Sequence, residues 1–147
     1  MQAYDPSTNP LNNNEWSFPL LEIVHIVSFA MAVGTIAIVD LRLLGLAMRR
    51  IPSAQLLRGT ELWTLSGILL AMFSGALLVT TDPLNYLHNP AFQFKLACLS
   101  AAIVYNYTIH RRIAQSKPSP IAAIAAGAVS LALWVSVVFG GIFYAFI

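Results

Sequence analysis

The sequence predicts an all-α fold: an integral membrane four-helix bundle with antiparallel, up-down neighbours. The chain of 147 residues is 58% hydrophobic and only 10% charged, whereas ordinary soluble domains are roughly 25% charged. After a polar tail over residues 1–16, one domain over residues 17–147 divides into four apolar segments, and each can supply the roughly 20 residues that cross a bilayer. The connections between these segments are short, which favours antiparallel neighbours in an up-down bundle.

The first two helices are separated by a proline. The first is predicted over about residues 17–49, because Pro52 disfavours helical backbone in the residue before it. The second is predicted over about residues 53–80, with Ser53 as its N-cap, since a serine oxygen at that position accepts a hydrogen bond from a free backbone N–H.

Prolines also mark the start of the last two helices. The third is predicted over about residues 90–112, because Pro90 suits the first helical turn, where no backbone donor is lost. The loop IAQSKPSP then ends this helix, and the fourth is predicted over about residues 120–146. The fourth helix contains no charged residue.

The distribution of basic residues predicts how the bundle lies in the membrane. Six of the eight flank the first and third connections: Arg49, Arg50, Arg58, Arg111, Arg112 and Lys117. Since cytoplasmic loops of membrane proteins carry an excess of Lys and Arg, both termini and the second connection are predicted to be extracytoplasmic. Trp16 and Tyr86 then fit the outer interface, where aromatic side chains are enriched.

Ionisable residues inside the helices predict a polar interior. Such residues are costly in a bilayer and usually face the inside of a bundle. At about 1.5 Å of helix rise per residue, His25 and Met72 lie roughly 12–14 Å below the outer end and Lys95 roughly 8 Å. Depth therefore separates two groups of side chains. The outer layer contains Glu22, His25, Met72 and Lys95, and the inner layer is a buried polar network of Asp40, Arg58, Glu61, Asn106 and His110.

Charge balance predicts ion pairs within each layer, because buried charges need partners. Glu22 is expected to pair with Lys95 in the outer layer. Arg58 is expected to pair with Asp40 or Glu61 in the inner layer. An alternative is that these pairs only fix helix register and orientation.

His25 is the most informative single residue, because a neutral imidazole inside a membrane helix can bind a metal or haem iron, relay protons or hydrogen-bond a neighbour. We predict a haem b in the outer half of the bundle with His25 as an axial ligand. Met72, at matching depth on an antiparallel helix, is the candidate second ligand, and Lys95 lies in the same layer. The alternative is a copper or zinc ion at Glu22 and His25, which lie one helical turn apart. Met72 is a further candidate ligand of that ion.

Several stretches resemble known families. The region from His25 through DLRLLG (Asp40–Gly45), NPAFQFKL (Asn89–Leu96) and NYTIH (Asn106–His110) resembles an uncharacterised bacterial inner-membrane family, one of the domain-of-unknown-function groups. More distantly, His25 and Lys95 look like positions in HemJ-type protoporphyrinogen oxidases, which are small helical haem b proteins, and in the membrane domain of CopD-type copper-resistance proteins. These two distant resemblances imply haem or copper at the outer layer.

Three functions are therefore compatible with the sequence. The first is a membrane redox protein that binds haem b and exchanges electrons with a quinone or a periplasmic partner. The second is a transport module for copper or protons, and the third is a noncatalytic membrane subunit whose polar residues only specify assembly. A homo-oligomer is compatible with each of them. No phosphate-binding loop or nucleophile elbow identifies an enzyme class, so catalytic residues are unknown. The net charge of +2 gives no indication of nucleic-acid binding, and the single cysteine, Cys98, excludes an internal disulfide.

Overall fold

A computed structural model describes residues 5–144 and residue 146, and within these residues the regular structure is entirely helical. The elements in chain order are η1 (Pro6–Thr8), η2 (Pro10–Asn12), α1 (Ser17–Leu43), α2 (Ser53–Thr81), α3 (Pro83–His88), α4 (Pro90–Tyr105), the π-helical turn η3 (Asn106–His110), α5 (Arg111–Gln115) and α6 (Pro120–Phe143). Since α4, η3 and α5 follow one another without a break, they form one long helical segment. The predicted all-α, four-helix antiparallel bundle is confirmed.

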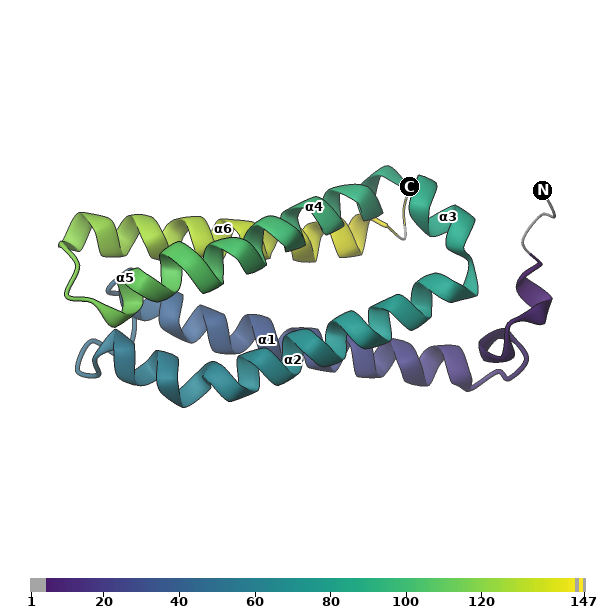
Figure 1. Cartoon of the computed structure of the whole chain (residues 1–147), viewed down its shortest axis with the longest axis horizontal. Coiled ribbons are helices and arrows are strands. Elements are labelled where there is room, and N and C mark those ends of the chain that lie inside the picture. The colour runs from purple at the N-terminus through teal and green to yellow at the C-terminus, as the bar shows by residue number, and fades with distance from the viewer. Residues whose placement is uncertain (1–4, 145, 147) are drawn as a thin grey trace.

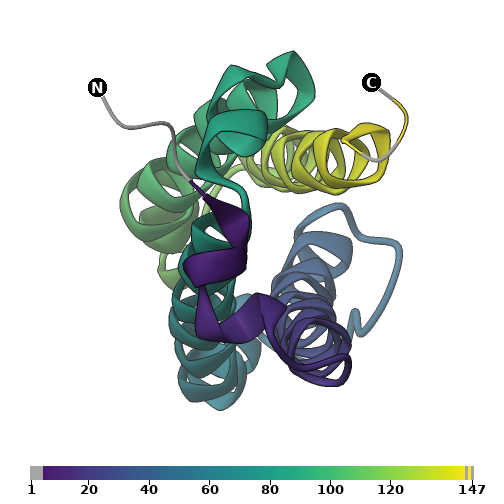
Figure 2. The same ribbon diagram turned by 90° about the vertical axis from the view of Figure 1, so that its right-hand side faces the viewer.

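The bundle consists of two helical hairpins (Figure 1). One hairpin is α1 packed along α2, and the other is the α4–η3–α5 segment packed along α6. Seen from the α3 end, the four helices occupy the corners of a square, with α6 beside α1 and the α4–η3–α5 segment beside α2 (Figure 2). The tail element η1 and the last turn of α6 lie at the same end as α3, whereas α5 and the connection between α1 and α2 lie at the other end (Figure 1). We call this other end, which carries most of the basic residues, the basic end.

The first helix is shorter than its predicted range of 17–49 and ends at Leu43. The reason is Gly45, whose φ of +72° is a left-handed conformation that glycine adopts without steric cost. The backbone N–H of the next residue, Leu46, then donates back to the carbonyl of Leu41 and closes the helix end. Arg42 stabilises the following loop, because its Nε donates a hydrogen bond to the carbonyl oxygen of Ile51 at 2.5 Å.

The starts of the other helices follow the prolines, with one difference from prediction. The predicted N-cap of α2, Ser53, is its first helical residue, and its hydroxyl donates instead to the carbonyl oxygen of Ala114 in α5 at 2.8 Å. This bond ties the two hairpins together at the basic end. Asn89 and Ser119 cap α4 and α6, each accepting a hydrogen bond from the backbone of the first turn.

Residues without large side chains let the helices approach closely. A Cβ atom at Gly67 of α2 would lie 2.8 Å from the backbone oxygen of Ser28 in α1. A Cβ atom at Gly127 of α6 would lie 2.9 Å from the backbone oxygen of Asp40. Small residues at helix interfaces are typical of membrane bundles, where association depends on van der Waals packing.

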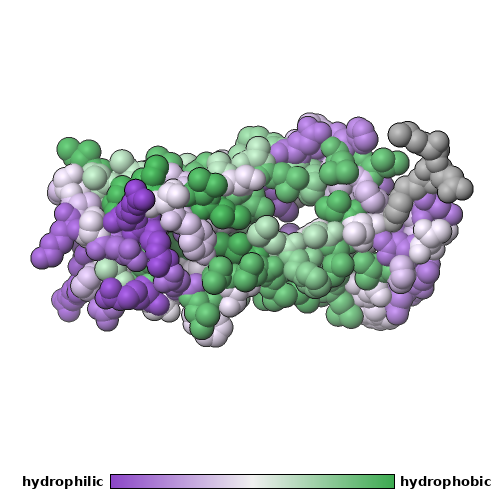
Figure 3. All heavy atoms as spheres, in the orientation of Figure 1, coloured by the Kyte–Doolittle hydropathy of each residue, from purple (hydrophilic) through white to green (hydrophobic). Residues whose placement is uncertain are grey.

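The outer surface of the bundle is apolar and suited to lipid. Three helices, α1, α2 and α6, are long and apolar enough to cross a membrane. Large apolar side chains such as Leu62, Trp63, Phe73, Phe94 and Phe139 are more than half exposed. Figure 3 shows hydrophobic residues along the middle of the molecule and hydrophilic residues gathered at its two ends. The protein is therefore embedded in a membrane, with its apolar middle in contact with lipid.

Candidate functional site

Two sites lie inside the bundle, one in each half. The outer site is a cavity of about 30 Å³ in the half nearer α3, and its lining comes from α1, α2, α4 and α6. The residues that line it are His25, Phe29, Ile68, Ala71, Met72, Lys95, Leu99 and Trp134. In the same half, Figure 3 shows an opening between the two hairpins.

His25 is held by α2 through one of its two ring nitrogens. Nδ1 lies 2.8 Å from the backbone oxygen of Ala71 and 3.1 Å from Oγ of Ser74. Since a carbonyl oxygen only accepts hydrogen bonds, Nδ1 carries the ring proton, and Nε2 of the neutral ring has a free electron pair. None of the described residues forms a hydrogen bond with Nε2. The half-buried ring packs against the backbone of Gly75, where a Cβ atom would lie 2.8 Å from Cε1 of the ring.

Met72 and Lys95 reach the same cavity from opposite hairpins. Met72 is about half exposed, so its thioether is accessible from the outside of the bundle. Lys95 is half-buried and lies against two glycines of α6: a Cβ atom at Gly140 would lie 3.0 Å from its Cβ, and one at Gly141 would lie 3.5 Å from its Nζ. The predicted outer-layer residues His25, Met72 and Lys95 thus line one cavity.

Glu22 does not join this group. Its side chain is exposed, and it is not part of the cavity lining. The predicted Glu22–Lys95 ion pair is absent among the described residues, because Lys95 folds against the glycines of α6. His88 is exposed at the end of α3 and donates from Nδ1 to the carbonyl oxygen of Leu84 at 2.8 Å.

The inner site is built around Asp40, whose side chain has no exposed surface. Its Oδ1 lies 2.7 Å from Nε2 of His110, and its Oδ2 accepts a hydrogen bond from Oγ of Ser130 at 2.9 Å. His110 and Ser130 are each 1% exposed. One carboxyl group thus connects α1, η3 and α6. The serine contacts the aspartate and not the histidine, so the three residues lack the serine–histidine bond that activates a nucleophile.

The π-helical turn helps to place the inner-site residues. The backbone N–H of Arg111 donates to the carbonyl of Asn106, a spacing of five residues where an α-helix has four. Such turns are rare and occur frequently at functional sites. Asn106 and His110, at the two ends of the turn, are both buried.

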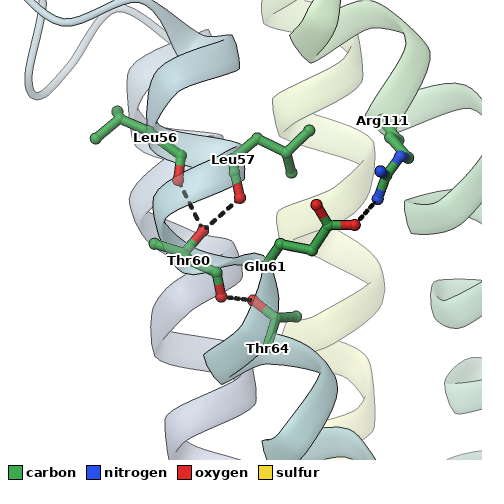
Figure 4. A network of polar contacts seen from close by, with 6 residues as sticks. All are labelled: Leu56, Leu57, Thr60, Glu61, Thr64 and Arg111. Carbon is green, nitrogen blue, oxygen red and sulfur yellow. Dashed lines mark hydrogen bonds and ion pairs between the residues drawn. The ribbon is translucent and has the colours of Figure 1, made fainter.

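Arg58, predicted to belong to the inner network, is exposed. The two carboxylates expected to pair with it contact other residues. Asp40 contacts His110, and Glu61 forms an ion pair with Arg111 that joins α2 to α5 (Figure 4). Arg58 lies close to the basic end of α2, where a long side chain extends to the polar surface instead of turning inward.

Ser74, Ser130 and Trp134 were not identified from the sequence. Ser130 and Trp134 lie on α6, which has no charged residue to draw attention to its inner face. Their spacing of one helical turn was the available signal, because i and i+4 share a face. Among the described residues, no group of three or more His, Cys, Asp or Glu side chains gathers closely enough to hold a metal ion.

Comparison with known proteins identifies a family but no activity. A family model described as a family of unknown function (DUF6644) matches residues 19–147. This agrees with the expected resemblance to a family without an assigned activity. No curated protein and no solved structure matches the chain.

Proposed function

Since the chain belongs to the family of unknown function DUF6644, which brings no activity with it, we propose a function from the outer site: the protein is a membrane redox protein that binds haem b through His25. The observation that carries this proposal is the Nδ1 contact of His25 with the Ala71 carbonyl at 2.8 Å. Histidines that bind metals almost always donate their other ring N–H to such an acceptor, which fixes the tautomer and the orientation of the ring. Nε2 is then available to bind iron.

The other residues around the outer cavity have the chemistry of a porphyrin site, and a porphyrin, which is much larger than the cavity of about 30 Å³, would also occupy the opening between the two hairpins (Figure 3). Phe29, Leu99 and Trp134 supply apolar and aromatic surface, and sites for cofactors are mostly apolar with a few polar groups. Met72 would be the second residue to hold the iron, since His/Met ligation occurs in cytochromes c. Lys95, which lines the same cavity, would supply a cation for a porphyrin carboxylate.

A bound haem b supplies one-electron redox chemistry at its iron. The protein's own residues would bind and orient the group, while the surrounding lipid-facing helices keep water away from it. The opening between the hairpins gives a lipid-soluble quinone an approach to this half of the bundle (Figure 3).

A second candidate, a copper site, rests on a different feature of the same cavity. His25 and Met72 offer one imidazole nitrogen and one thioether sulfur, and soft ligands of this kind favour Cu(I). The exposed position of Glu22 removes the carboxylate that a zinc site would use.

The test is a spectrophotometric titration of the purified protein with haemin in mild detergent. We expect stoichiometric binding to the unchanged protein, and His25→Ala should weaken it by at least about tenfold, since altering even outer-shell partners of a metal costs 10–100-fold. His88→Ala is the matched control, because His88 is exposed and lies on α3 outside the cavity. Equal haemin affinity in the unchanged protein and in His25→Ala would contradict His25 as a ligand.

A parallel titration with Cu(I) separates the two candidates. Under the haem proposal, copper binds weakly and without dependence on Met72. Tight Cu(I) binding that is lost in both His25→Ala and Met72→Leu, together with no haemin binding, would instead identify a copper module. Binding of neither group would leave the role of a noncatalytic membrane subunit.

A further inference from the structure

The inner site borders a second cavity that the outer site does not use. This cavity of about 20 Å³ lies between α1, α2 and η3. Its lining includes Thr35, Thr64, Asn106, Tyr107 and His110. A space of roughly 10–15 Å³ or more holds a water molecule when polar partners surround it, so the cavity is large enough and polar enough for water.

Three buried polar atoms at this cavity lack a partner among the described residues. They are Nδ1 of His110, Nδ2 of Asn106 and the hydroxyl oxygen of Tyr107. Buried polar groups are almost always hydrogen-bonded, to protein or to ordered water. Since all three belong to residues that line one cavity, water in that cavity is the available partner for them.

The cavity also reaches the surface of the bundle. Glu61 and Arg111 line it as well, and their side chains are 35% and 33% exposed. Arg111 donates to Oε1 of Glu61, and Oε2 has no hydrogen-bond partner among the residues drawn in Figure 4. One end of the cavity therefore borders the buried His110, and the other borders a half-exposed carboxylate near the basic end.

We propose that this cavity is a proton-exchange site, through which the buried Asp40–His110 pair exchanges protons with water at the basic end. A proton from cavity water binds Nδ1 of His110, and the proton on Nε2 passes to Oδ1 of Asp40, 2.7 Å away. The ring is then neutral with its proton on Nδ1, the aspartate is a neutral acid, and the cavity water recovers a proton from bulk water. The reverse sequence returns the proton.

The groups that face this path come from every element around it. Asp40 lies on α1, Glu61 on α2, Tyr107 on η3 and Arg111 on α5. On α6 the contact is Ser130, which holds Oδ2 of the aspartate and does not titrate near neutral pH. Tyr105, on α4, has its ring centroid 6.5 Å from that of the imidazole and directs its hydroxyl to a backbone oxygen of α6. Proton-carrying chains of Asp, Glu and His inside membrane helices are a common functional arrangement.

This inference is independent of haem or copper at the outer site, and its test needs neither. Protein labelled with 15N-histidine is placed in lipid nanodiscs, and transfer of magnetisation from water to the imidazole of His110 is measured by NMR. The signal of His110 is the one that persists in both His25→Ala and His88→Ala. We expect rapid exchange between water and the His110 ring, although the residue is only 1% exposed.

Filling the cavity should slow this exchange. Thr64→Leu should slow it by at least about tenfold, because the remaining space falls below the roughly 10–15 Å³ that a water molecule needs. Ser66→Leu is the matched control, since Ser66 is exposed on the same helix, and exchange should stay unchanged. Thr60→Leu fills the same cavity from its edge and replaces Thr64→Leu if that variant does not fold.

Glu61→Gln tests the connection to the surface. It keeps the shape of the side chain but removes its ability to take up a proton, and we expect slower exchange at His110 with no loss of the folded protein. No water contact at His110 in the unchanged protein would overturn the proposal. Exchange that stays fast when the cavity is filled would overturn it too.

Discussion

Removing the carboxyl group of Asp40 should destabilise the bundle more than any change on its surface. The side chain is fully buried and holds two others, Nε2 of His110 at 2.7 Å and Oγ of Ser130 at 2.9 Å. Asp40→Ala leaves Nε2 of His110 and Oγ of Ser130 without the carboxyl group, and no other described side chain takes its place. Hydrogen bonds to charged groups contribute about 1.5–3 kcal/mol each, and breaking a buried pair costs about 3–5 kcal/mol. We therefore expect the free energy of unfolding to fall by about 3–5 kcal/mol.

The assay is reversible unfolding in mixed micelles with increasing SDS, followed by circular dichroism. Asp40→Asn keeps the shape of the side chain and one acceptor oxygen, so its loss should lie between those of the unchanged protein and Asp40→Ala. Glu15→Ala is the control, because Glu15 is exposed before α1 and surface substitutions usually stay within about 0.5 kcal/mol. A loss below about 1 kcal/mol for Asp40→Ala would refute the reasoning, since a buried group with two partners does not behave like a surface residue.

Three further changes test the packing and the outer site. Gly67→Ala places a Cβ atom 2.8 Å from a backbone oxygen of α1, so the helices must separate. The free energy of unfolding should fall by about 1–3 kcal/mol. Gly34→Ala, with no atom within 4 Å of its Cβ, is the control in the same SDS assay. Gly75→Ala places a Cβ atom 2.8 Å from the His25 ring, which is a side chain and can move, so haemin titration should show weaker binding with a smaller loss of stability than Gly67→Ala. Burial raises the pKa of Tyr86, so the folded state favours the neutral phenol. The stability that this preference gives is complete below the unfolded pKa of about 10. It is lost as the pH rises through the folded pKa. Tyr86→Phe should therefore lose less stability than the unchanged protein between neutral pH and about pH 11 in thermal melts, and equal losses would refute this assignment.

Most of the fold follows from the sequence because the signals for it are local. Apolar length predicts the helices, and Pro90 and Pro120 stand at the first residues of α4 and α6. The end of α1 was predicted too late, because the prediction rests on Pro52 as the residue that ends the helix. The left-handed backbone at Gly45, and not the later proline, ends the helix.

Depth along a helix also brings His25, Met72 and Lys95 into one layer, and all three line the outer cavity. The choice of partners is harder to predict, because it depends on how each helix is rotated and how closely its neighbours approach. Glu61 pairs with Arg111 instead of Arg58, since the two hairpins meet near α5.

The inner site shows the same limit in another form. Asp40 and His110 were expected in one layer, but their direct contact depends on tertiary packing around η3, whose π-helical turn no local pattern predicts. Ser130 completes the contact from a helix without charges, and only the tertiary packing of α6 against α1 makes it visible.

The central claim, that His25 holds a haem b in the outer cavity, is tested most directly by a visible absorption spectrum. The protein is purified in mild detergent from haem-replete cells, and oxidised and dithionite-reduced spectra are recorded beside those of His25→Ala. We predict a Soret band and reduced α and β bands in near-stoichiometric amount in the unchanged protein, and their loss in the variant. A featureless spectrum from the unchanged protein, with the haem supply of the cells confirmed, would contradict the account.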